Sequence, residues 1–333
     1  MKITINNKYD GRSLEIAFHS GEAAVSSVID CMRCAYGKGY NYVNPKMFDS
    51  DYINSCIGKG DLVPFVGMAD TVSAVTVSAI KNSYFDKAWE LGAAAVTDGF
   101  KGFHLASAAV KYILKYFGNE QLFYAHAVMF YESAGKALED SGFVPTGFTY
   151  GVCDAKKHLT QLNYKSQKHT WAVYIRNNGK NIIKRVYVPA RFTQIVEELY
   201  NSIGIFPDIN LDYHEPTTES RIQLKQDDYH KTLYLYVIKS GFDLHKRIKE
   251  AEQKYNGELQ SIVLFLSISD RGAVFGLEKL IKAGYKFTGI KPLCAEHEYA
   301  IMSKTNSVYI DFNEMKMTDN MKNIFDKINA VNN

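Results

Sequence analysis

The sequence predicts two α/β (α+β) units in tandem, each a mixed, mostly antiparallel sheet flanked by helices. Strand-like and helix-like segments alternate along the first half of the chain. A polar, lysine-rich stretch, 154–169, then interrupts this order. Beyond it, the order of elements in Leu91–Phe143 recurs in Leu233–Tyr285. These three observations favour a duplicated fold over a single large domain.

The first segments of the chain alternate between apolar runs and helical spacing. A short strand is followed by an amphipathic helix, a second helix, a hairpin that turns at Ala69-Asp70, and a further strand. The ranges expected for these elements are Leu14–His19, Glu22–Tyr36, Pro45–Gly58, Leu62–Ile80 and Ala88–Val96. This order predicts a strand, two helices and a meander of three strands.

A helix, a strand and a second helix complete the first unit. The apolar residues of Gly102–Phe117 recur at helical spacing, "QLFYAHAV" reads as a strand, and "YESAGKALEDSGF" reads as a helix stopped by Gly142. We expect a last strand pair around Pro145 and Gly147.

The polar stretch predicts the domain boundaries: a first unit at 1–153, a linker at 154–169 and a second unit at 170–333. In the second unit "WAVYI" and "IIKRVYV" read as strands, and "ARFTQIVEELYNSIG" reads as a helix that begins after Pro189. We expect "FPDINLDYHEPTTES" to be a loop.

The internal repeat aligns without a gap. Gly99-Phe100 falls on Gly241-Phe242, and Thr146-Gly147 falls on Thr288-Gly289. Few residues are identical, so the shared order of elements carries the inference. The second unit is predicted to be a degenerate copy of the first.

Composition and charge exclude several classes of protein. A net charge of +3 over 333 residues gives no reason to expect nucleic acid or an acidic membrane as a partner. The N-terminus lacks the apolar run of a signal peptide, so we expect a cytoplasmic protein. The 5 cysteines fit reduced thiols. Cys31 and Cys34 form C-x-x-C without a second pair, so no metal site is expected.

The turn "TDGFKGFHLASAAV" joins a predicted strand to a predicted helix. A helix N-terminus presents unpaired N–H groups to an anion, Gly102 and Ala106 allow close approach, and Lys101 adds positive charge. Many strand–helix turns contain glycine and lysine for structural reasons alone. Either interpretation fits the turn by itself.

The first unit resembles the GCN5-related N-acetyltransferase (GNAT) superfamily, over about residues 12–150. The consensus motif of the acyl-CoA-binding turn in that family is Q/R-x-x-G-x-G/A. This chain has a lysine at the first position, a histidine where glycine is usual, and an alanine at the last position. "ALEDSGFVPTGF" is similar to the family's later helix and closing strand. The resemblance implies that acetyl-CoA binds at Lys101, Gly102, Phe103, His104, Leu105 and Ala106.

The resemblance also assigns roles to the strand before the turn. Its backbone at Ala94, Ala95 and Val96 would pair with the pantetheine arm. Glu90 matches a glutamate that deprotonates the amine in some members, and burial is expected to raise its pKa. A strand-end carboxylate exposed to solvent is the alternative.

The usual proton donor, a tyrosine in the later helix, is replaced here by Leu138. Tyr131 lies two turns earlier on that helix and is the substitute we assign, while Tyr124 and His126 are further candidates or core residues. In the second unit, Asp243 and Leu244 replace the lysine and glycine of the turn, which argues against a second cofactor site.

The implied function is transfer of an acetyl group from acetyl-CoA to the amine of a small molecule or peptide, by direct attack. The alternative is a non-catalytic regulatory module that binds acyl-CoA or another small ligand. The absent tyrosine favours the module, and Glu90 with Lys101 favours the enzyme.

Overall fold

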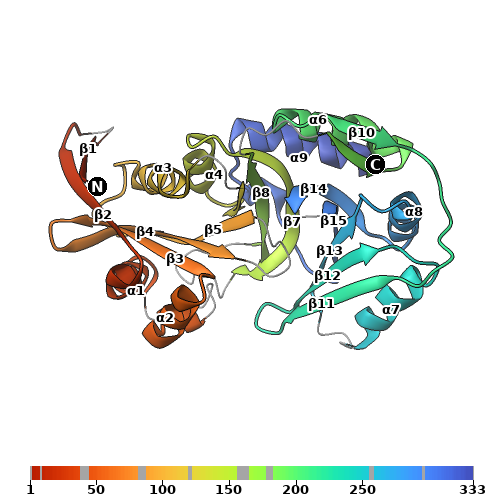
Figure 1. The fold of residues 1–333 in the computed structure, drawn as a ribbon, viewed down its shortest axis with the longest axis horizontal. Helices are drawn as coiled ribbons and strands as arrows, with labels where there is room; N and C mark the ends of the chain where they lie inside the picture. The colour runs from red at the N-terminus through yellow and green to blue at the C-terminus, as the bar shows by residue number, and fades with distance from the viewer. Residues whose placement is uncertain are drawn as a thin grey trace.

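A computed structural model describes residues 2–7, 10–37, 45–81, 88–118, 122–155, 165–177, 183–254, 259–294 and 297–332. These residues form one continuous, curved sheet of 13 strands and a separate pair of short parallel strands (Figure 1). The prediction of a mixed, mostly antiparallel sheet flanked by helices is confirmed.

The strands of the first half are short and mostly apolar on at least one face. They are β1 (Lys2–Asn6), β2 (Ser13–Ser20), β3 (Leu62–Ala69), β4 (Val72–Lys81), β5 (Ala88–Val96), β6 (Leu122–Val128), β7 (Val144–Asp154) and β8 (Lys168–Arg176). Its helices are η1 (Glu22–Ala24), α1 (Val25–Tyr36), η2 (Pro45–Phe48), α2 (Ser50–Gly58), α3 (Leu105–Phe117) and α4 (Glu132–Glu139).

The second half has the same types of element. Its strands are β9 (Lys184–Tyr187), β10 (Pro207–Asn210), β11 (Arg221–Asp227), β12 (Thr232–Lys239), β13 (Ser261–Ser267), β14 (Lys286–Cys294) and β15 (His297–Thr305). Its helices are η3 (Ala190–Phe192), α6 (Thr193–Ser202), α7 (Leu244–Lys254), α8 (Ala273–Lys282), η4 (Phe312–Glu314) and α9 (Asp319–Asn332).

Three local predictions need correction. β1 was not predicted, and it pairs with β2 at the edge of the sheet. The expected strand pair around Pro145 and Gly147 is the single strand β7, whose partner is β8. The expected loop after helix α6 contains the short strand β10, which pairs with β9.

β8 also bears on the predicted domain division. It lies between β6 and β7, although the sequence places it after the polar stretch and in the second unit. Most of the predicted linker, 156–164, lies outside the described residues. The limits 1–153 and 170–333 stay predictions, and we propose that the first unit extends through β8.

The two halves meet in a symmetric way. The strand order β5-β6-β8-β7 of the first half is repeated as β12-β13-β15-β14 in the second, and β7 pairs with β14 in antiparallel order. The pair at this junction is Gly147 opposite Gly289, two positions that the internal repeat equates. A Cβ on Gly147 would lie 2.6 Å from the Thr288 carbonyl oxygen, so this close approach requires glycine.

The gap-free alignment does not hold throughout the repeat. Leu91 of β5 pairs with Ala125, whereas its counterpart Leu233 of β12 pairs with Ile262 rather than with Ser267. The shared topology, rather than the aligned residues, therefore relates the two halves.

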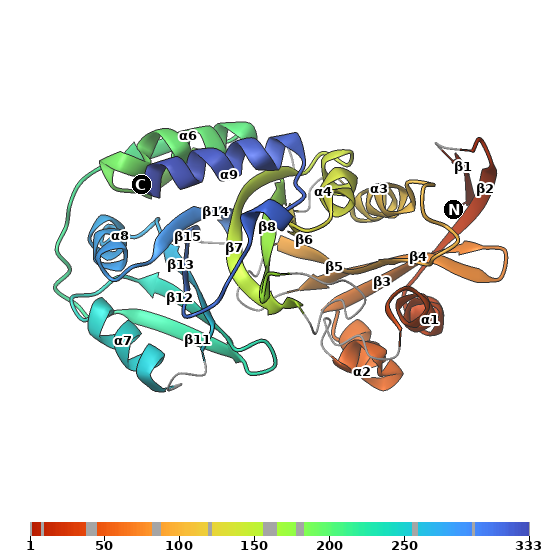
Figure 2. The same ribbon diagram turned by 180° about the vertical axis from the view of Figure 1, so that it is seen from behind.

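Helices cover both faces of the first half of the sheet. α3 and α4 lie on one face, and α1 and α2 lie on the other (Figures 1 and 2). α9 lies over the junction of β7 and β14 and contacts both strands. The Tyr150 hydroxyl donates to Asn329 at 2.9 Å, and the Phe287 N–H donates to Asn332 at 2.9 Å. The last helix thus holds the two halves together.

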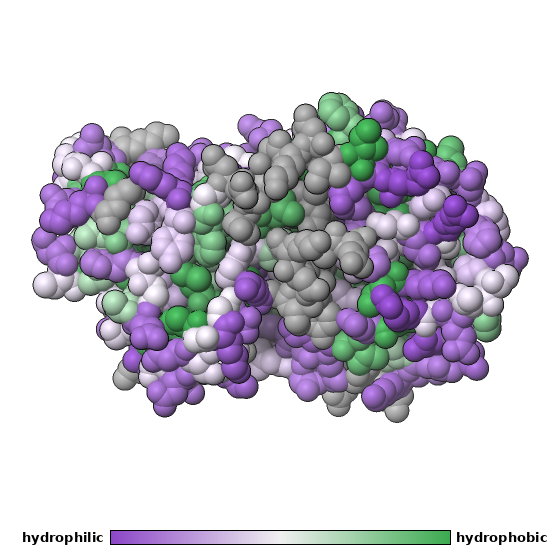
Figure 3. All heavy atoms as spheres, in the orientation of Figure 1, coloured by the Kyte–Doolittle hydropathy of each residue, from purple (hydrophilic) through white to green (hydrophobic). Residues whose placement is uncertain are grey.

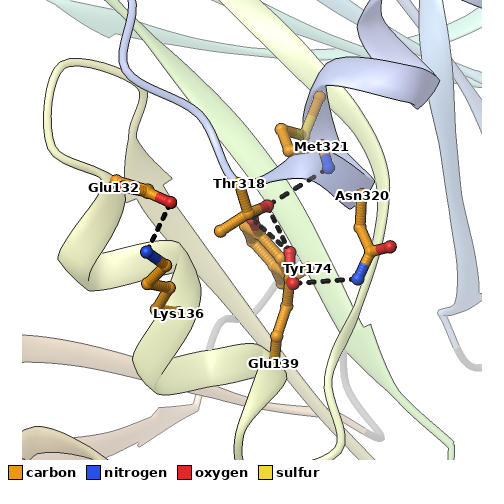
Figure 4. A network of polar contacts seen from close by, with 7 residues as sticks. All are labelled: Glu132, Lys136, Glu139, Tyr174, Thr318, Asn320 and Met321. Carbon is orange, nitrogen blue, oxygen red and sulfur yellow. Dashed lines mark hydrogen bonds and ion pairs between the residues drawn. The ribbon is translucent and has the colours of Figure 1, made fainter.

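The N-terminus of α9 is fixed by a polar network (Figure 4). Glu139, at the end of α4, accepts hydrogen bonds from the Tyr174 hydroxyl at 3.2 Å, from Asn320 at 2.9 Å and from the Thr318 hydroxyl. Thr318 in turn accepts from the Met321 N–H at 3.2 Å. Because every member has a partner, the network fixes α9 against α4 and β8.

The surface of the face seen in Figure 3 is mainly hydrophilic, and its apolar side chains form small separate groups. Within the described residues no helix combines the length and the apolar character needed to cross a membrane.

Candidate active site

β5 and β6 begin as a parallel pair and then separate. Ala88 pairs with Leu122, and the pairing continues only as far as Leu91 with Ala125, although both strands extend further. β5 bulges here, because Ala93 adopts a left-handed conformation with φ of 49° and the register with β4 shifts. The C-terminal part of β5 therefore has an edge that β6 does not pair with, next to the backbone positions where the resemblance implies that the pantetheine arm binds.

The predicted pantetheine positions lie on this part of β5. Ala95 and Val96 pair with β4, so the opposite edge of the strand faces the opening. Ala95 is buried, Val96 is half-buried and Ala94 is exposed. The Tyr36 hydroxyl, at the end of α1, donates to the Ala94 carbonyl at 2.7 Å. A peptide-like ligand on this edge would compete with Tyr36 for that oxygen.

The turn after β5 leads directly into α3. Gly102 has φ of 90° and His104 has φ of 54°, so both are left-handed, and α3 begins at Leu105. His104 is the N-cap but makes no side-chain capping hydrogen bond. The N–H groups of the first turn of a helix have no intrahelical acceptors. The turn thus has the backbone geometry that an anion needs.

The side chains of the predicted cofactor turn divide into two sets. Phe103 and Leu105 are buried in the core, where they anchor the turn. Lys101 and His104 are exposed, and Ala106 is half-buried. The sequence analysis placed all of them in the binding turn, and the structure leaves only the second set accessible from solvent.

Lys101 forms an ion pair with Asp98 at 2.6 Å within the same turn. Both side chains are about three-quarters exposed, at 73% and 75%. Such exposed pairs contribute little free energy, about 0–1 kcal/mol, so the ammonium group can exchange Asp98 for a phosphate at small cost.

A polar cluster lies where β5 and β6 separate. Glu90 accepts a hydrogen bond from the Tyr124 hydroxyl at 2.8 Å, and its other oxygen lies 3.1 Å from His126 Nδ1. The side chains of Glu90 and His126 are 25% and 17% exposed. Trp89 packs on Phe117 of α3, and neighbouring strand residues point to opposite faces, so Glu90 faces away from α3.

The expectation that the pKa of Glu90 is raised is wrong. Burial acts to raise the pKa of Glu90, but the hydrogen bond from His126, the charges of His126 and Lys291 and the hydrogen bond from Tyr124 together lower it to about 2. Glu90 is therefore an ionised, weakly basic carboxylate at neutral pH. An ionised carboxylate is suited to orient a neighbouring histidine, and less suited to remove a proton itself.

Lys291 reaches this cluster from β14 in the second half. It is 1% exposed, and its ammonium lies 3.6 Å from the centre of the Tyr124 ring and 5.6 Å from that of Phe265. The sequence analysis missed this residue. A charged residue inside the apolar strand "FTGIKPL" was the available signal, because a lysine there must be buried or at an edge.

Tyr131 lies elsewhere. It precedes α4 and lines a small cavity with residues of α4 and the segment before α9, among them Gly135, Lys316 and Thr318. This cavity is on the face covered by α3 and α4, so the sheet separates Tyr131 from Glu90. Leu138, at the family's tyrosine position, is buried in the core. Tyr124 and His126, the further candidates, are the residues that contact Glu90.

In the matching turn of the second half, the polar groups are hydrogen-bonded to another segment of the same chain. The Ser220 N–H donates to Asp243 Oδ1 at 2.7 Å, and the Phe242 N–H donates to the Thr218 carbonyl at 3.1 Å. Gly241 donates to the Ser220 hydroxyl at 2.9 Å. Segment 218–220 therefore occupies the hydrogen-bonding groups that would face a phosphate.

Within the described residues, no three His, Cys, Asp or Glu side chains gather in the way a metal ion requires. The candidate site contains the polar groups of Glu90, His126, Tyr124 and Lys291, together with the edge of β5 that β6 does not pair with.

Comparison with known proteins gave matches in solved structures alone. No family model and no curated protein matches the chain. A GNAT-family acetyltransferase from Desulfovibrio desulfuricans has 12% identity and a TM-score of 0.37, over 49% of this chain and 99% of its own. The ribosomal-protein-S5-alanine acetyltransferase of Vibrio fischeri has 12% identity and a TM-score of 0.37, over 54% and 98%.

The spermidine N-acetyltransferase of Vibrio cholerae, solved with CoA and spermine, has 12% identity and a TM-score of 0.36, over 48% of this chain and 94% of its own. Each of these structures thus corresponds to about half of the chain. The order of the elements is the one expected from the resemblance: a meander that leads to β5, a strand that parts from β6, and a helix followed by the closing strands. The predicted GNAT-like fold is confirmed.

Proposed function

We propose that the protein binds acetyl-CoA along the free edge of β5 and at the turn before α3, and transfers the acetyl group to an amine beside His126. The observation that carries this proposal is the separation of β5 from β6 directly after Glu90 and Leu91. The opening brings a strand edge that β6 does not pair with, a helix N-terminus and a polar cluster close together along the chain.

The cofactor half of the proposal assigns each predicted residue a part. Ala94, Ala95 and Val96 supply backbone groups for the pantetheine arm, and the first turn of α3 supplies N–H groups for the pyrophosphate. Lys101 and His104, both exposed, add side-chain donors on the same turn. Phe103 and Leu105 act indirectly, because their burial fixes the turn.

In the proposed catalytic step, His126 rather than Glu90 accepts the proton of the attacking amine. If the His126 Nδ1–H donates to the Glu90 carboxylate, Nε2 is left as an acceptor. The amine nitrogen then attacks the thioester carbon, the C–N bond forms and the C–S bond breaks. The amine proton passes to Nε2 and from there to the leaving thiolate, so acetyl-CoA and amine yield amide and CoA. N–H groups on the edge of β5 that β6 leaves unpaired would stabilise the oxyanion.

The experiment has two parts. Calorimetry with acetyl-CoA measures binding, and release of free CoA thiol over a panel of primary amines measures turnover. Glu90→Gln and His126→Gln are expected to keep acetyl-CoA affinity and to lower kcat by about 10²–10⁴-fold, since general-base catalysis contributes that much. An acetyl-CoA titration without heat or thermal shift would contradict the proposal.

The non-catalytic module remains the second candidate, because a specific observation favours it. Leu138 is a buried core residue, so α4 offers no hydroxyl to the leaving thiolate at the position the family uses. Tight acetyl-CoA binding together with no thiol release above the buffer rate for any amine would select this candidate.

A further inference from the structure

We propose that Lys291, from the second half of the chain, is a positioning residue of the site formed by Glu90, Tyr124 and His126. The inference rests on the proposed function for its consequence in catalysis, but its physical claim concerns the state of the Glu90 carboxylate. It gives the second half, which lacks an open turn, a direct part in the site of the first half.

The contact geometry supports this role. The Lys291 ammonium lies 3.6 Å from the Tyr124 ring centre, and the hydroxyl of that same ring donates to Glu90 at 2.8 Å. A cation over an aromatic face is attracted by the ring, more strongly when both are withdrawn from water. Tyr124 and Lys291 are each 1% exposed. The Lys291 ammonium thus contacts the face of the Tyr124 ring, and the Tyr124 hydroxyl donates a hydrogen bond to Glu90.

The titratable groups around Glu90 come from three strands. Tyr124 and His126 face it from β6, Lys291 approaches from β14, and Tyr234 of β12 is close enough for its titration to be affected by Glu90. Lys291 and His126 are the basic groups whose charges act on Glu90. The positive charge of Lys291 favours the ionised carboxylate, which burial alone would disfavour.

The topology makes this contact possible. β14 is separated from β6 in the sheet order by β7 and β8, yet the curvature brings the end of Lys291 onto Tyr124. The lysine lies two residues after Gly289, the residue at the junction of the two halves. A first half without β14 would lack the cation, so the site is complete only in the full chain.

The test is a titration of the Glu90 carboxyl carbon by NMR, with the signal assigned by Glu90→Gln and folding followed by circular dichroism. In the wild-type chain the signal is expected to stay in its ionised form down to about pH 4. In Lys291→Met the midpoint is expected to rise by about 1–3 units, the usual effect of one nearby opposite charge. Lys291→Arg keeps the cation and is expected to restore the wild-type curve.

Lys304→Met is the matched control. Lys304 lies 5.3 Å from the centre of the Tyr285 ring and pairs with Glu252, so this change removes another lysine that lies over a tyrosine. It is expected to leave the Glu90 titration unchanged. A folded Lys291→Met chain with a wild-type Glu90 curve would overturn the proposal.

A second variant covers the case in which Lys291→Met does not fold. Removing one member of a buried pair leaves an uncompensated charge, so Lys291→Met with Glu90→Gln should recover folding. A double variant that also fails to fold would show that the lysine only fills space, and would overturn the proposal.

Turnover separates this proposal from the proposed function. If the wild-type chain releases CoA, Lys291→Met should lower kcat at least tenfold with KM for acetyl-CoA little changed, and move the acid limb of the pH profile upward. If the wild-type chain neither binds acetyl-CoA nor releases CoA, the proposed function fails, and the Glu90 titration still decides the part of Lys291.

Discussion

The two strand–helix turns of the molecule, at 97–105 and at 240–244, have the same place in the fold and opposite surroundings. A Cβ built on Gly99 meets nothing within 4 Å, whereas one built on Gly241 would lie 2.1 Å from the Ser220 nitrogen and 2.5 Å from the Thr218 oxygen. The first turn is open to solvent, and the second is covered by backbone from the same chain.

The comparison shows how one element can serve two purposes. In both turns the backbone of a strand end and a helix start offers N–H groups, and each group needs an acceptor. Segment 218–220 supplies acceptors in the second half, and the Asp243 carboxylate in turn accepts a hydrogen bond from the Ser220 N–H. In the first half we propose that the cofactor supplies them. The difference lies in the loop before the turn as much as in the turn itself.

The largest difference between the two turns is expected in the loss of stability caused by Gly241→Ala and by Gly99→Ala. The added methyl group of the first variant meets fixed backbone atoms, so a loss of about 3 kcal/mol in the free energy of unfolding is expected. The second adds a methyl group in open space at φ of 40°, with a loss of about 1 kcal/mol. Urea unfolding measures both, and equal losses would mean that segment 218–220 does not press on Gly241.

Asp243→Ala should cost about 1–3 kcal/mol, because the buried Ser220 N–H loses its acceptor. Burial acts to raise the pKa of Asp243, and the hydrogen bonds from Ser220 outweigh it and lower the pKa. A lowered folded-state pKa means that this stabilisation is present above the ordinary pKa of about 4 and is lost as pH falls below it. The gap between wild type and variant should therefore narrow in acid; a gap independent of pH would remove Asp243 from this role.

Lys101→Asp should weaken acetyl-CoA binding at least tenfold, since a charge-assisted hydrogen bond to phosphate contributes about 1.5–3 kcal/mol. Stability should hardly change, because its ion pair with Asp98 is exposed. Lys246→Asp, at an equally exposed lysine of α7, is the matched control and should leave the affinity as it is. Calorimetry at fixed ionic strength gives both affinities.

His104→Gly should have the smallest effect, and unlike the preceding changes it should increase the free energy of unfolding. A non-glycine residue at φ of 54° costs roughly 1 kcal/mol, so glycine should stabilise the fold by up to that amount. If the imidazole donates to the phosphates, acetyl-CoA binding weakens by a factor of a few; if it crowds them, binding tightens. Thermal unfolding with and without ligand measures the two effects separately.

Much of the fold was predictable, because its signals are local. The strand Ala88–Val96, the glycine-containing turn and the helical spacing up to Phe117 each appear within a short window. The equivalence of Gly147 and Gly289 also came from the sequence, and the structure pairs them directly. Most predictions that use only turn chemistry and apolar periodicity were confirmed, whereas the strand pair expected around Pro145 and Gly147 and the loop expected after α6 were wrong.

What could not be predicted depends on contacts between distant segments. β8 follows a polar stretch, which reads as a boundary, but its position is decided by pairing with β6 and β7. The pKa of Glu90 depends on Lys291, about two hundred residues away along the chain, whose approach requires the curvature of the whole sheet. Reasoning from burial alone predicted a raised pKa for Glu90, which is the wrong direction, because the residues that contact Glu90 could not be identified from the sequence.

The measurement that tests the account most directly is calorimetry of the full chain with acetyl-CoA, repeated with Lys101→Asp and Asp243→Ala. The account predicts one site per chain, at least a tenfold loss of affinity for Lys101→Asp, and an unchanged stoichiometry and affinity for a folded Asp243→Ala chain. Two equivalent sites, no binding, or an affinity that Lys101→Asp leaves unaltered would contradict it.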